Sequence, residues 1–223
     1  IAIEDYQAVL LTYFRNNILH AFVLPSLIAA LVEHNGRISQ KNLINVIKTL
    51  YPFLQAELFL KWKPEQLEQQ ISQYADALIN AKLIERDSEG DLISPAPNSE
   101  DHNQLVILAA PVKQSLERYY MTLALIAQRG SGNISVKQVE DLSHLLGQRL
   151  SVLYEFNSPE FFDKSLFQSF IKVLTQQGYI CTNEQGAIAF ERNFSNMAEG
   201  AKLVLDEATL QMLQHITTFN DDE

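Results

Sequence analysis

Five histidines are the residues of this sequence best suited to general base or metal chemistry: His20, His34, His102, His144 and His215. No two of them are four residues apart, so the zinc-binding spacing of an HExxH helix is absent. The serine-nucleophile motif GxSxG, the phosphate-binding loop GxxxxGK and the dinucleotide motif GxGxxG are absent as well. Cys181 is the only cysteine, which excludes an intrachain disulfide, and we expect it to be a small buried hydrophobe. The sequence therefore predicts no catalytic residue, no metal site and no cofactor in this chain.

One group of polar residues near the N-terminus could bind a charged ligand. If this segment is helical, Arg15 and Asn16 precede His20 by five and four residues and lie beside it. An arginine and an amide next to an imidazole can hold a phosphate or a carboxylate. The alternative is structural, with these groups capping a helix or bridging to a neighbouring domain. Arg15, Asn16 and His20 are therefore the candidate substrate-binding residues, and the spacing leaves both interpretations open.

A second cluster, at residues 158–164, has the pattern of a helix start. Ser158 is a favourable N-cap, Pro159 suits the first helical position, and Glu160 is an acid in the first turn. The two phenylalanines that follow are typical of a core. We interpret this cluster as structural.

Composition narrows the possible partners. The chain has 223 residues, 47% of them hydrophobic, and a formal net charge of -10. An acidic chain has no bulk attraction to nucleic acid phosphates or to anionic lipid head groups. The longest apolar run, Ile18 to Val32, is interrupted by polar residues and is too short for a membrane span, so we expect a buried or surface-lying helix. The sequence begins with Ile1 and no signal peptide follows, and we expect it to be a piece of a longer polypeptide.

Hydrophobic periodicity and breaker residues indicate a chain made mainly of helices. Predicted helices cover residues 5–23, 25–34, 40–50, 52–62, 64–81, 102–128, 136–146, 148–155, 159–177 and 195–217. Short β-prone segments around Gly90 and Gly186 predict two hairpins, at residues 82–94 and 179–191. The breaker cluster at residues 95–99 is the best candidate linker.

The chain contains an internal repeat with a constant offset of 96 residues and no gap. The matched positions are Gly36 and Gly132, Ile38 and Ile134, Ser39 and Ser135, Lys41 and Lys137, Leu50 and Leu146, Leu54 and Leu150, Leu78 and Leu174, Ile84 and Ile180, Gly90 and Gly186. They fall on helix caps, apolar positions and turn glycines, where a fold is specified. We interpret the repeat as duplication of one unit of three helices followed by a β-hairpin, which is the outline of a winged helix.

The predicted fold class is therefore mainly α, with two repeated winged-helix-like units preceded by an apolar helical segment. The predicted domains are the apolar segment at 1–35, the first unit at 36–97, a long linking helix at 98–130, the second unit at 131–192, and a C-terminal helix and tail at 193–223. A DNA-binding role would need basic residues on the third helix of a unit. The predicted third helix of the first unit, at 64–81, carries Glu65, Glu68 and Asp76 and has no lysine or arginine. We therefore expect no nucleic acid partner.

Several segments, in the same order, resemble the C-terminal region of bacterial membrane-bound glycerol-3-phosphate acyltransferases. They are residues 11–18 (LTYFRNNI) with His20-Ala21-Phe22, residues 25–29 (PSLIA), residues 50–60 (LYPFLQAELFL) with Trp62, residues 148–154 (QRLSVLY) and residues 159–164 (PEFFDK). The resemblance covers most of the chain, from about Leu10 to Ile180. Several blocks in order are far more specific than any one of them.

The resemblance implies a parent enzyme of phospholipid synthesis that acylates position 1 of sn-glycerol 3-phosphate from acyl-ACP or acyl-CoA. In that family a His-x4-Asp motif upstream of this region carries catalysis. Here the residues five places after the histidines are Pro25, Ser39, Ile107, Arg149 and Asn220, and none is an aspartate. We therefore expect this chain to be inactive by itself.

The absent active-site motif, the apolar N-terminal helices and the duplicated unit favour a scaffold role within such a parent. We expect the chain to pack on the upstream acyltransferase domain, brace its acyl-donor groove and help seat it on the membrane surface, at the cytoplasmic face of the bacterial inner membrane. Arg15, Asn16 and His20 could contribute to the phosphate site of that domain. The alternative is a free-standing winged-helix-like module for interaction or regulation.

Overall fold

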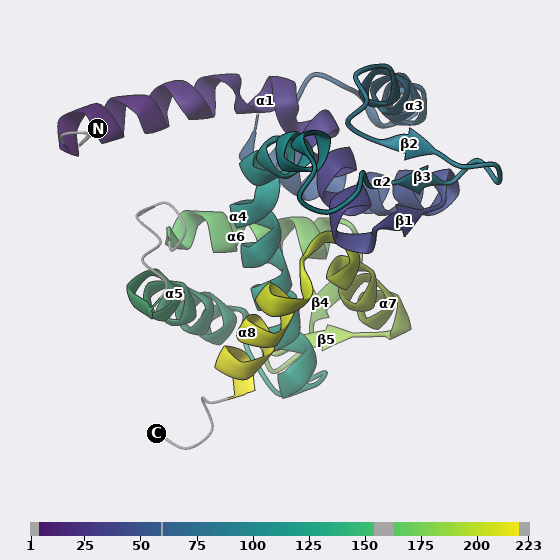
Figure 1. The fold of residues 1–223 in the computed structure, drawn as a ribbon. Helices are drawn as coiled ribbons and strands as arrows, with labels where there is room; N and C mark the ends of the chain where they lie inside the picture. The colour runs from purple at the N-terminus through teal and green to yellow at the C-terminus, as the bar shows by residue number, and fades with distance from the viewer. Residues whose placement is uncertain (1–4, 59, 154–162, 219–223) are drawn as a thin grey trace. The chain divides into compact units, whose positions relative to one another are not determined.

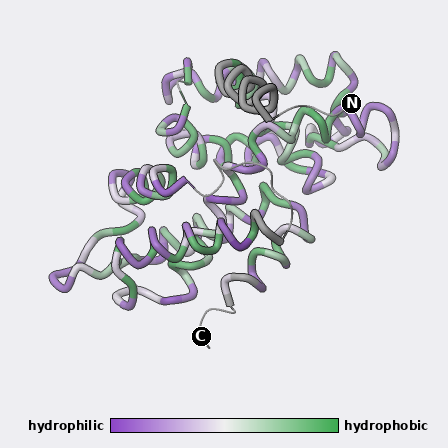
Figure 2. The backbone as a smooth tube through the Cα atoms, turned by 90° about the vertical axis from the view of Figure 1, so that its left-hand side faces the viewer, coloured by the Kyte–Doolittle hydropathy of each residue, from purple (hydrophilic) through white to green (hydrophobic). Residues whose placement is uncertain are grey.

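The computed structural model describes residues 5–58, 60–153 and 163–218, and most of them are helical (Figure 1). In chain order the elements are α1 (Asp5–Asn35), β1 (Arg37–Ile38), α2 (Gln40–Glu57), α3 (Pro64–Asn80), β2 (Glu85–Arg86), β3 (Leu92–Ile93), α4 (Glu100–Arg129), α5 (Val136–Leu153), α6 (Lys164–Gln176), β4 (Ile180–Thr182), β5 (Ile188–Phe190), α7 (Arg192–Gly200), a 3-10 helix (Ala201–Val204) and α8 (Glu207–Thr218). Hydrophobic and hydrophilic positions alternate along these helices, as amphipathic helices require (Figure 2).

The chain divides into two compact units. Unit 1 comprises residues 1–48 and 58–112, and unit 2 comprises residues 49–57 and 113–223. Helix α2 therefore contributes its first half to unit 1 and its second half to unit 2, and the same is true of α4.

Unit 1 is built around the second half of α1. From Val23 to Val32 every residue except Pro25 is buried, and the helix packs against α3, β1 and β3. Helix α3 buries one face, formed by Leu67, Ile71, Ala75 and Leu78 at steps of four, four and three residues. The strands form an antiparallel sheet in the order β1-β3-β2, in which Ile93 is opposite both Arg37 and Glu85.

Unit 2 has its core between α6, the second half of α4 and the end of α2. The buried residues of α6 are Phe167, Phe170, Ile171, Val173 and Leu174. Strands β4 and β5 form an antiparallel hairpin, and an isolated bridge joins Ser135 to Ala187 at the start of β5. Phe194 of α7 and Leu213 of α8 are fully buried.

Local hydrogen bonds recur 96 residues apart, in keeping with the repeat in the sequence. In the first hairpin Asp87 N donates to Asp91 O at 3.0 Å, and in the second Asn183 N donates to Ala187 O at 2.9 Å. The last turns of α3 and α6 end in the same way. Leu83 N donates to Leu78 O at 3.0 Å in the first copy, and the equivalent bond at the end of α6 is 2.9 Å long. Sequence similarity at these positions is thus accompanied by the same backbone geometry.

The residue after the C-cap of α3 and its equivalent after the C-cap of α6 allow a matched test of backbone strain. Lys82 has φ +62°, and its equivalent in the second copy, Gly178, has φ +72°. Both residues end a helix in a Schellman motif, which needs a left-handed residue at this position. A side chain there is unfavourable because its Cβ crowds the backbone, whereas glycine is free of that strain.

We expect Lys82→Gly to raise the free energy of unfolding by about 0.5–1 kcal/mol, because relief of strain exceeds the extra chain entropy of glycine. The matched variant Gly178→Ala should lower it by about 1 kcal/mol. Urea unfolding followed by circular dichroism measures both. Two changes of the same sign would contradict the interpretation.

Three predicted helix breaks are wrong. Helix α1 runs unbroken through Pro25, and α2 runs unbroken through Pro52. In the second copy α5 is also one helix from Val136 to Leu153, instead of two.

An internal proline removes one backbone hydrogen bond. In α1 and α2 that loss is offset by burial of the apolar residues on both sides of the proline, among them Leu24, Leu27, Tyr51 and Phe53.

Other predicted boundaries also differ. The expected helix at 195–217 is divided, because Leu205 is extended and a new helix, α8, begins at Glu207. Asp163 is extended and caps α6, so the helix expected from Pro159 begins instead at Lys164, while Ser158, Pro159 and Glu160 lie outside the described residues. Residues 36–97, predicted to be a unit of three helices and a hairpin, contain two helices, α2 and α3. A unit of three helices is obtained only if α1 is included. Cys181, expected to be buried, is exposed.

Candidate functional site

Helix α1 carries all three residues predicted to bind a substrate. His20 is exposed on this helix, just before its buried half begins. The side chains of Arg15 and Asn16 are not among those that the structure describes. Their role beside His20 therefore stays a prediction.

Two other histidines have structural partners in unit 1. His34 Nε2 is 2.7 Å from Glu33 Oε2 in the last turn of α1. His102 Nδ1 is 3.4 Å from Ser94 Oγ, and the backbone N–H of His102 donates to Ser99 Oγ at 3.0 Å, which caps the start of α4. Within the described ranges, no group of three histidine, cysteine or acidic residues could hold a metal ion.

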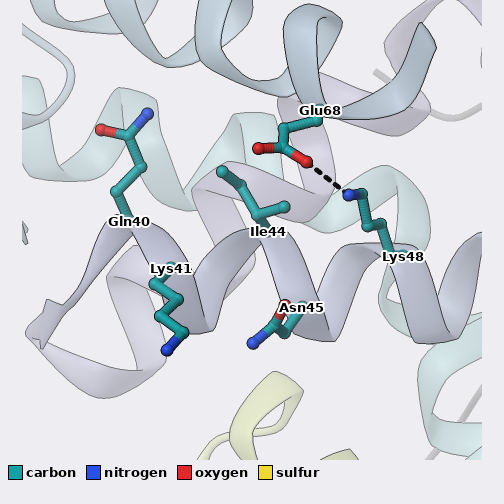
Figure 3. Close-up of a pocket in the computed structure, with 6 residues that line it drawn as sticks. All are labelled: Gln40, Lys41, Ile44, Asn45, Lys48 and Glu68. Atoms are coloured by element: carbon teal, nitrogen blue, oxygen red, sulfur yellow. Dashed lines mark hydrogen bonds and ion pairs between the residues drawn. The ribbon is translucent and has the colours of Figure 1, made fainter. Parts of the chain in front are cut away.

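An open groove in unit 1 lies between the first half of α2 and α3 (Figure 3). It is lined by Gln40, Lys41, Ile44, Asn45, Lys48 and Glu68. Lys48 Nζ and Glu68 Oε2 form an ion pair at 2.5 Å, so the two charges neutralise each other. Gln40 donates to Ser72 Oγ at 3.2 Å and accepts from Arg86 at 2.8 Å. These side chains join structural elements of unit 1 and include no nucleophile with an adjacent base.

The strongest polar cluster of unit 2 is buried and was not predicted from the sequence. Glu57, the last residue of α2, accepts a hydrogen bond from Arg118 Nη2 at 2.7 Å and another from Ser115 Oγ at 3.2 Å. The side chains of Glu57 and Arg118 are only 6% and 5% exposed. An acid at the C-terminal end of a helix is disfavoured by the helix dipole, and the arginine compensates for this as well as for the loss of hydration.

Tyr119 adjoins this ion pair and stacks against Phe170, with ring centroids 4.5 Å apart and planes at 5°. Burial raises the pKa of Tyr119 well above its usual value, and the charge of Glu57 raises it further. The phenol therefore stays protonated at neutral pH. Because Glu57, Arg118 and Tyr119 are shielded from solvent, we interpret the cluster as part of the folding core and not as a site for a substrate.

A second polar cluster of unit 2 caps α8. Asp206 Oδ1 accepts from Thr209 N at 2.8 Å, while Oδ2 accepts from Thr209 Oγ1 at 2.8 Å and from Lys113 Nζ at 3.1 Å. Burial by itself would raise the pKa of Asp206, but the hydrogen bonds from Thr209 and Lys113 outweigh it and lower the pKa to about 2. The ionised carboxylate thus fastens α8 to the second half of α4.

This pKa implies a pH-dependent contribution to stability. A group whose pKa is lower in the folded protein stabilises it above the unfolded value of 3.8, and this stability is lost as the pH falls towards about 2. The side chain is 34% exposed, so screening by solvent reduces the contribution to about 1–2 kcal/mol. We expect Asp206→Asn, which keeps a good N-cap, to be less stable than the wild type by this amount at pH 7 and equally stable near pH 2. Urea unfolding at several pH values measures the difference, and a difference that did not change with pH would contradict the assignment.

Comparison with known families decides what the chain is. The family model described as the glycerol-3-phosphate acyltransferase C-terminal region matches residues 1–183. The chain belongs to this family. The assignment confirms the resemblance recognised in the sequence blocks.

Three similar curated proteins are each named glycerol-3-phosphate acyltransferase. The chain is 40% identical to the one from Pseudomonas putida strain GB-1 over 221 residues, and 42% identical to the one from Ectopseudomonas mendocina strain ymp over 224 residues; each match covers 99% of this chain and 27% of the relative. The protein from Pseudomonas aeruginosa strain LESB58 is 40% identical over 199 residues, covering 89% of this chain and 24% of the relative. The chain thus spans about a quarter of the length of the curated relatives it matches. No solved structure matches it significantly.

The region that the family model matches ends inside the hairpin of unit 2, between β4 and β5. The folded unit continues beyond it, since β5 pairs with β4 and Phe194 is fully buried.

One segment of α1, Ile18–Asn35, is apolar and long enough to cross a membrane by length and composition alone, which corrects the expectation that the apolar run from Ile18 is too short. Half of that segment is buried inside the protein. A core helix of a globular protein meets the same criterion, and the burial from Val23 onward agrees with that interpretation.

Proposed function

We propose that this chain is a non-catalytic scaffold within a larger glycerol-3-phosphate acyltransferase, and that it packs on the acyltransferase domain. The parent enzyme transfers an acyl chain from acyl-ACP or acyl-CoA to position 1 of sn-glycerol 3-phosphate. The observation that carries the proposal is the family match to a C-terminal region, in a chain covering 27% of its relatives. The sequence contains no His-x4-Asp pair, which leaves the chemistry to the rest of the parent.

The scaffold consists of two winged-helix-like packing modules. The sheet order β1-β3-β2 supports this for unit 1, where β1 follows α1 and the hairpin follows α3. In unit 2 the bridge between Ser135 and Ala187 places the segment before α5 beside β5, as β1 lies beside β3. The recurring hydrogen bonds at an offset of 96 residues support a common origin of the modules.

The scaffold seats the catalytic domain at the cytoplasmic face of the bacterial inner membrane. The net charge of -10 argues against attraction to anionic lipid by this chain as a whole. Any membrane contact made by this chain is therefore local and apolar, and we assign the parent a peripheral or otherwise membrane-associated location.

Acyl transfer by the separate parts tests the proposal. Purified full-length protein should convert labelled glycerol 3-phosphate and acyl-CoA or acyl-ACP to lysophosphatidate, and this chain alone should not. Deletion of residues 13–223 from the full-length protein should abolish or strongly reduce turnover. Activity of the isolated chain, or wild-type turnover after the deletion, would disprove the scaffold role.

A direct contribution of α1 to the phosphate site is a finer proposal, based on Arg15, Asn16 and His20. Arg15→Ala in the full-length enzyme should raise KM for glycerol 3-phosphate about tenfold or more, since a charge-assisted hydrogen bond contributes roughly 1.5–3 kcal/mol. The matched control is Arg86→Ala, because Arg86 already pairs with Asp76 in unit 1. An unchanged KM for Arg15→Ala would reject the contribution.

A further inference from the structure

Helix α1 changes abruptly from exposed to buried. Ile18 is 58% exposed and Phe22 is 46% exposed, and both His20 and Ala21 between them are exposed. The very next residue, Val23, is 1% exposed and begins the buried half of the helix. Figure 1 shows the N-terminal half of α1 projecting away from the other elements of unit 1.

The two exposed apolar side chains lie on one face of the helix. Ile18 and Phe22 are four residues apart, so they are neighbours about one turn apart. Leaving side chains of this size in water forfeits roughly 1.5–3 kcal/mol each relative to full burial. A helix that projects and carries such a pair at the edge of its buried half is suited to continue its packing on another protein surface.

We propose that the face of α1 formed by Ile18 and Phe22 docks on the polypeptide that precedes this region in the full-length protein. This proposal rests on the proposed function, and it names the contact surface. In the relatives about three quarters of the chain lies outside the matched region. Because the matched family is a C-terminal region, we place that remainder before α1 in the same polypeptide.

Covalent connection favours this occupant over a second copy of the chain. A segment joined to α1 through the backbone is present at an effective concentration in the millimolar range, far above that of a separate molecule. An apolar contact of modest size is therefore stable within one polypeptide even where it is too weak to hold two together.

A lipid surface fits the same face less well. The apolar window continues from Ile18 into residues that already form the core of unit 1, so that part is not free to insert. The exposed part, from Ile18 to Phe22, contains His20 and directly follows the polar sequence Arg15-Asn16-Asn17. The net charge of -10 gives the chain no bulk attraction to an anionic bilayer, and residues 1–22 contain one arginine and no lysine, far fewer basic residues than an interfacial helix carries.

Site-specific photo-cross-linking in the full-length protein tests the docking surface. A benzophenone amino acid is placed at Ile18 or Phe22, and for comparison at Ile107 of α4, an equally apolar position that is 73% exposed. Mass spectrometry of the products should show cross-links from positions 18 and 22 to residues that precede this region in the same chain. The yield from these positions should exceed that from position 107 at least fivefold. Cross-links to lipid or to a second copy, or equal yields from all three positions, would overturn the proposal.

A second measurement separates docking from a role inside this chain. Phe22→Ala should leave the Tm of the isolated chain unchanged, because the side chain is exposed there, and should lower the Tm of the full-length protein by several degrees. Equal losses in both proteins would show that Phe22 packs within this region, and the proposal would fail. The acyl-transfer assay reports independently on the proposed function, since an inactive full-length protein can still show the cross-links.

Discussion

Replacing Arg118 by methionine is expected to lower the free energy of unfolding by about 3–5 kcal/mol, the largest effect we predict for any single polar residue described. Glu57 would keep its charge in a site where its side chain is only 6% exposed, accepting a hydrogen bond from Ser115 but no longer paired with a positive charge. The loss comes from this unpaired charge and exceeds the net contribution of the ion pair itself. Urea unfolding followed by circular dichroism measures the change.

A double variant distinguishes the two contributions. Glu57→Leu combined with Arg118→Met removes both charges and fills a similar volume, so we expect it to recover most of the stability lost by Arg118→Met. The four proteins of this cycle give the coupling energy directly. The matched control is the exposed pair of Lys164 and Asp141, whose side chains are 43% and 52% exposed. Lys164→Met should change stability by no more than about 1 kcal/mol, and an equal loss in both experiments would contradict the buried-charge explanation.

Phe53→Ala is expected to have a similarly large effect, a loss of about 3–5 kcal/mol in the free energy of unfolding. Phe53 is 2% exposed, and its ring lies 4.9 Å from that of Phe170 and 6.0 Å from that of Tyr119. Truncation would leave a cavity between α2, α4 and α6 and would remove one ring from an aromatic cluster. It would also loosen the packing around Glu57, four residues further along α2, and its ion pair with Arg118.

The control for Phe53→Ala is Phe22→Ala in the isolated chain. It removes the same atoms from a side chain that is 46% exposed, so we expect a change within about 0.5 kcal/mol. Denaturant unfolding of both variants provides the comparison. Similar losses at the two positions would mean that the buried aromatic cluster contributes no more than surface burial does.

Local signals in the sequence predicted much of the fold correctly. Gly36, Gly90 and Gly186 lie in turns with positive φ, as expected for residues without a Cβ. The β-prone segments around the glycines form the two hairpins, and the helix predicted at 64–81 is found as α3. These features depend on residues that are near one another in the chain, so pattern and propensity are sufficient to find them.

Prolines show where local reasoning was insufficient. Pro25 and Pro52 were expected to start new helices, and in the structure each lies inside a continuous one. The preference of proline for the first turn of a helix contributes less free energy than the burial of the apolar residues around it. How much of that surface is buried depends on contacts with distant elements, which a single segment of sequence does not reveal.

The functional and polar residues were likewise found only in part from the sequence. Arg15, Asn16 and His20 were found from their spacing on one helix, and the structure describes only His20 among their side chains, as an exposed residue. Glu57 and Arg118 were missed because 61 residues separate them, and each by itself resembles an ordinary surface charge. Only the packing of α2 on α4 in unit 2 brings them together.

By itself, the sequence determined the family, the mainly helical class and the 96-residue repeat, because these depend on residue order and on local periodicity. It also determined that this chain carries no His-x4-Asp pair. The tertiary structure alone decided that Glu57 and Arg118 form a buried pair and that α1 passes from exposed to buried between Phe22 and Val23. Burial is a property of the folded surroundings, and the same charged or apolar residue contributes very different free energy according to whether other elements exclude water from it.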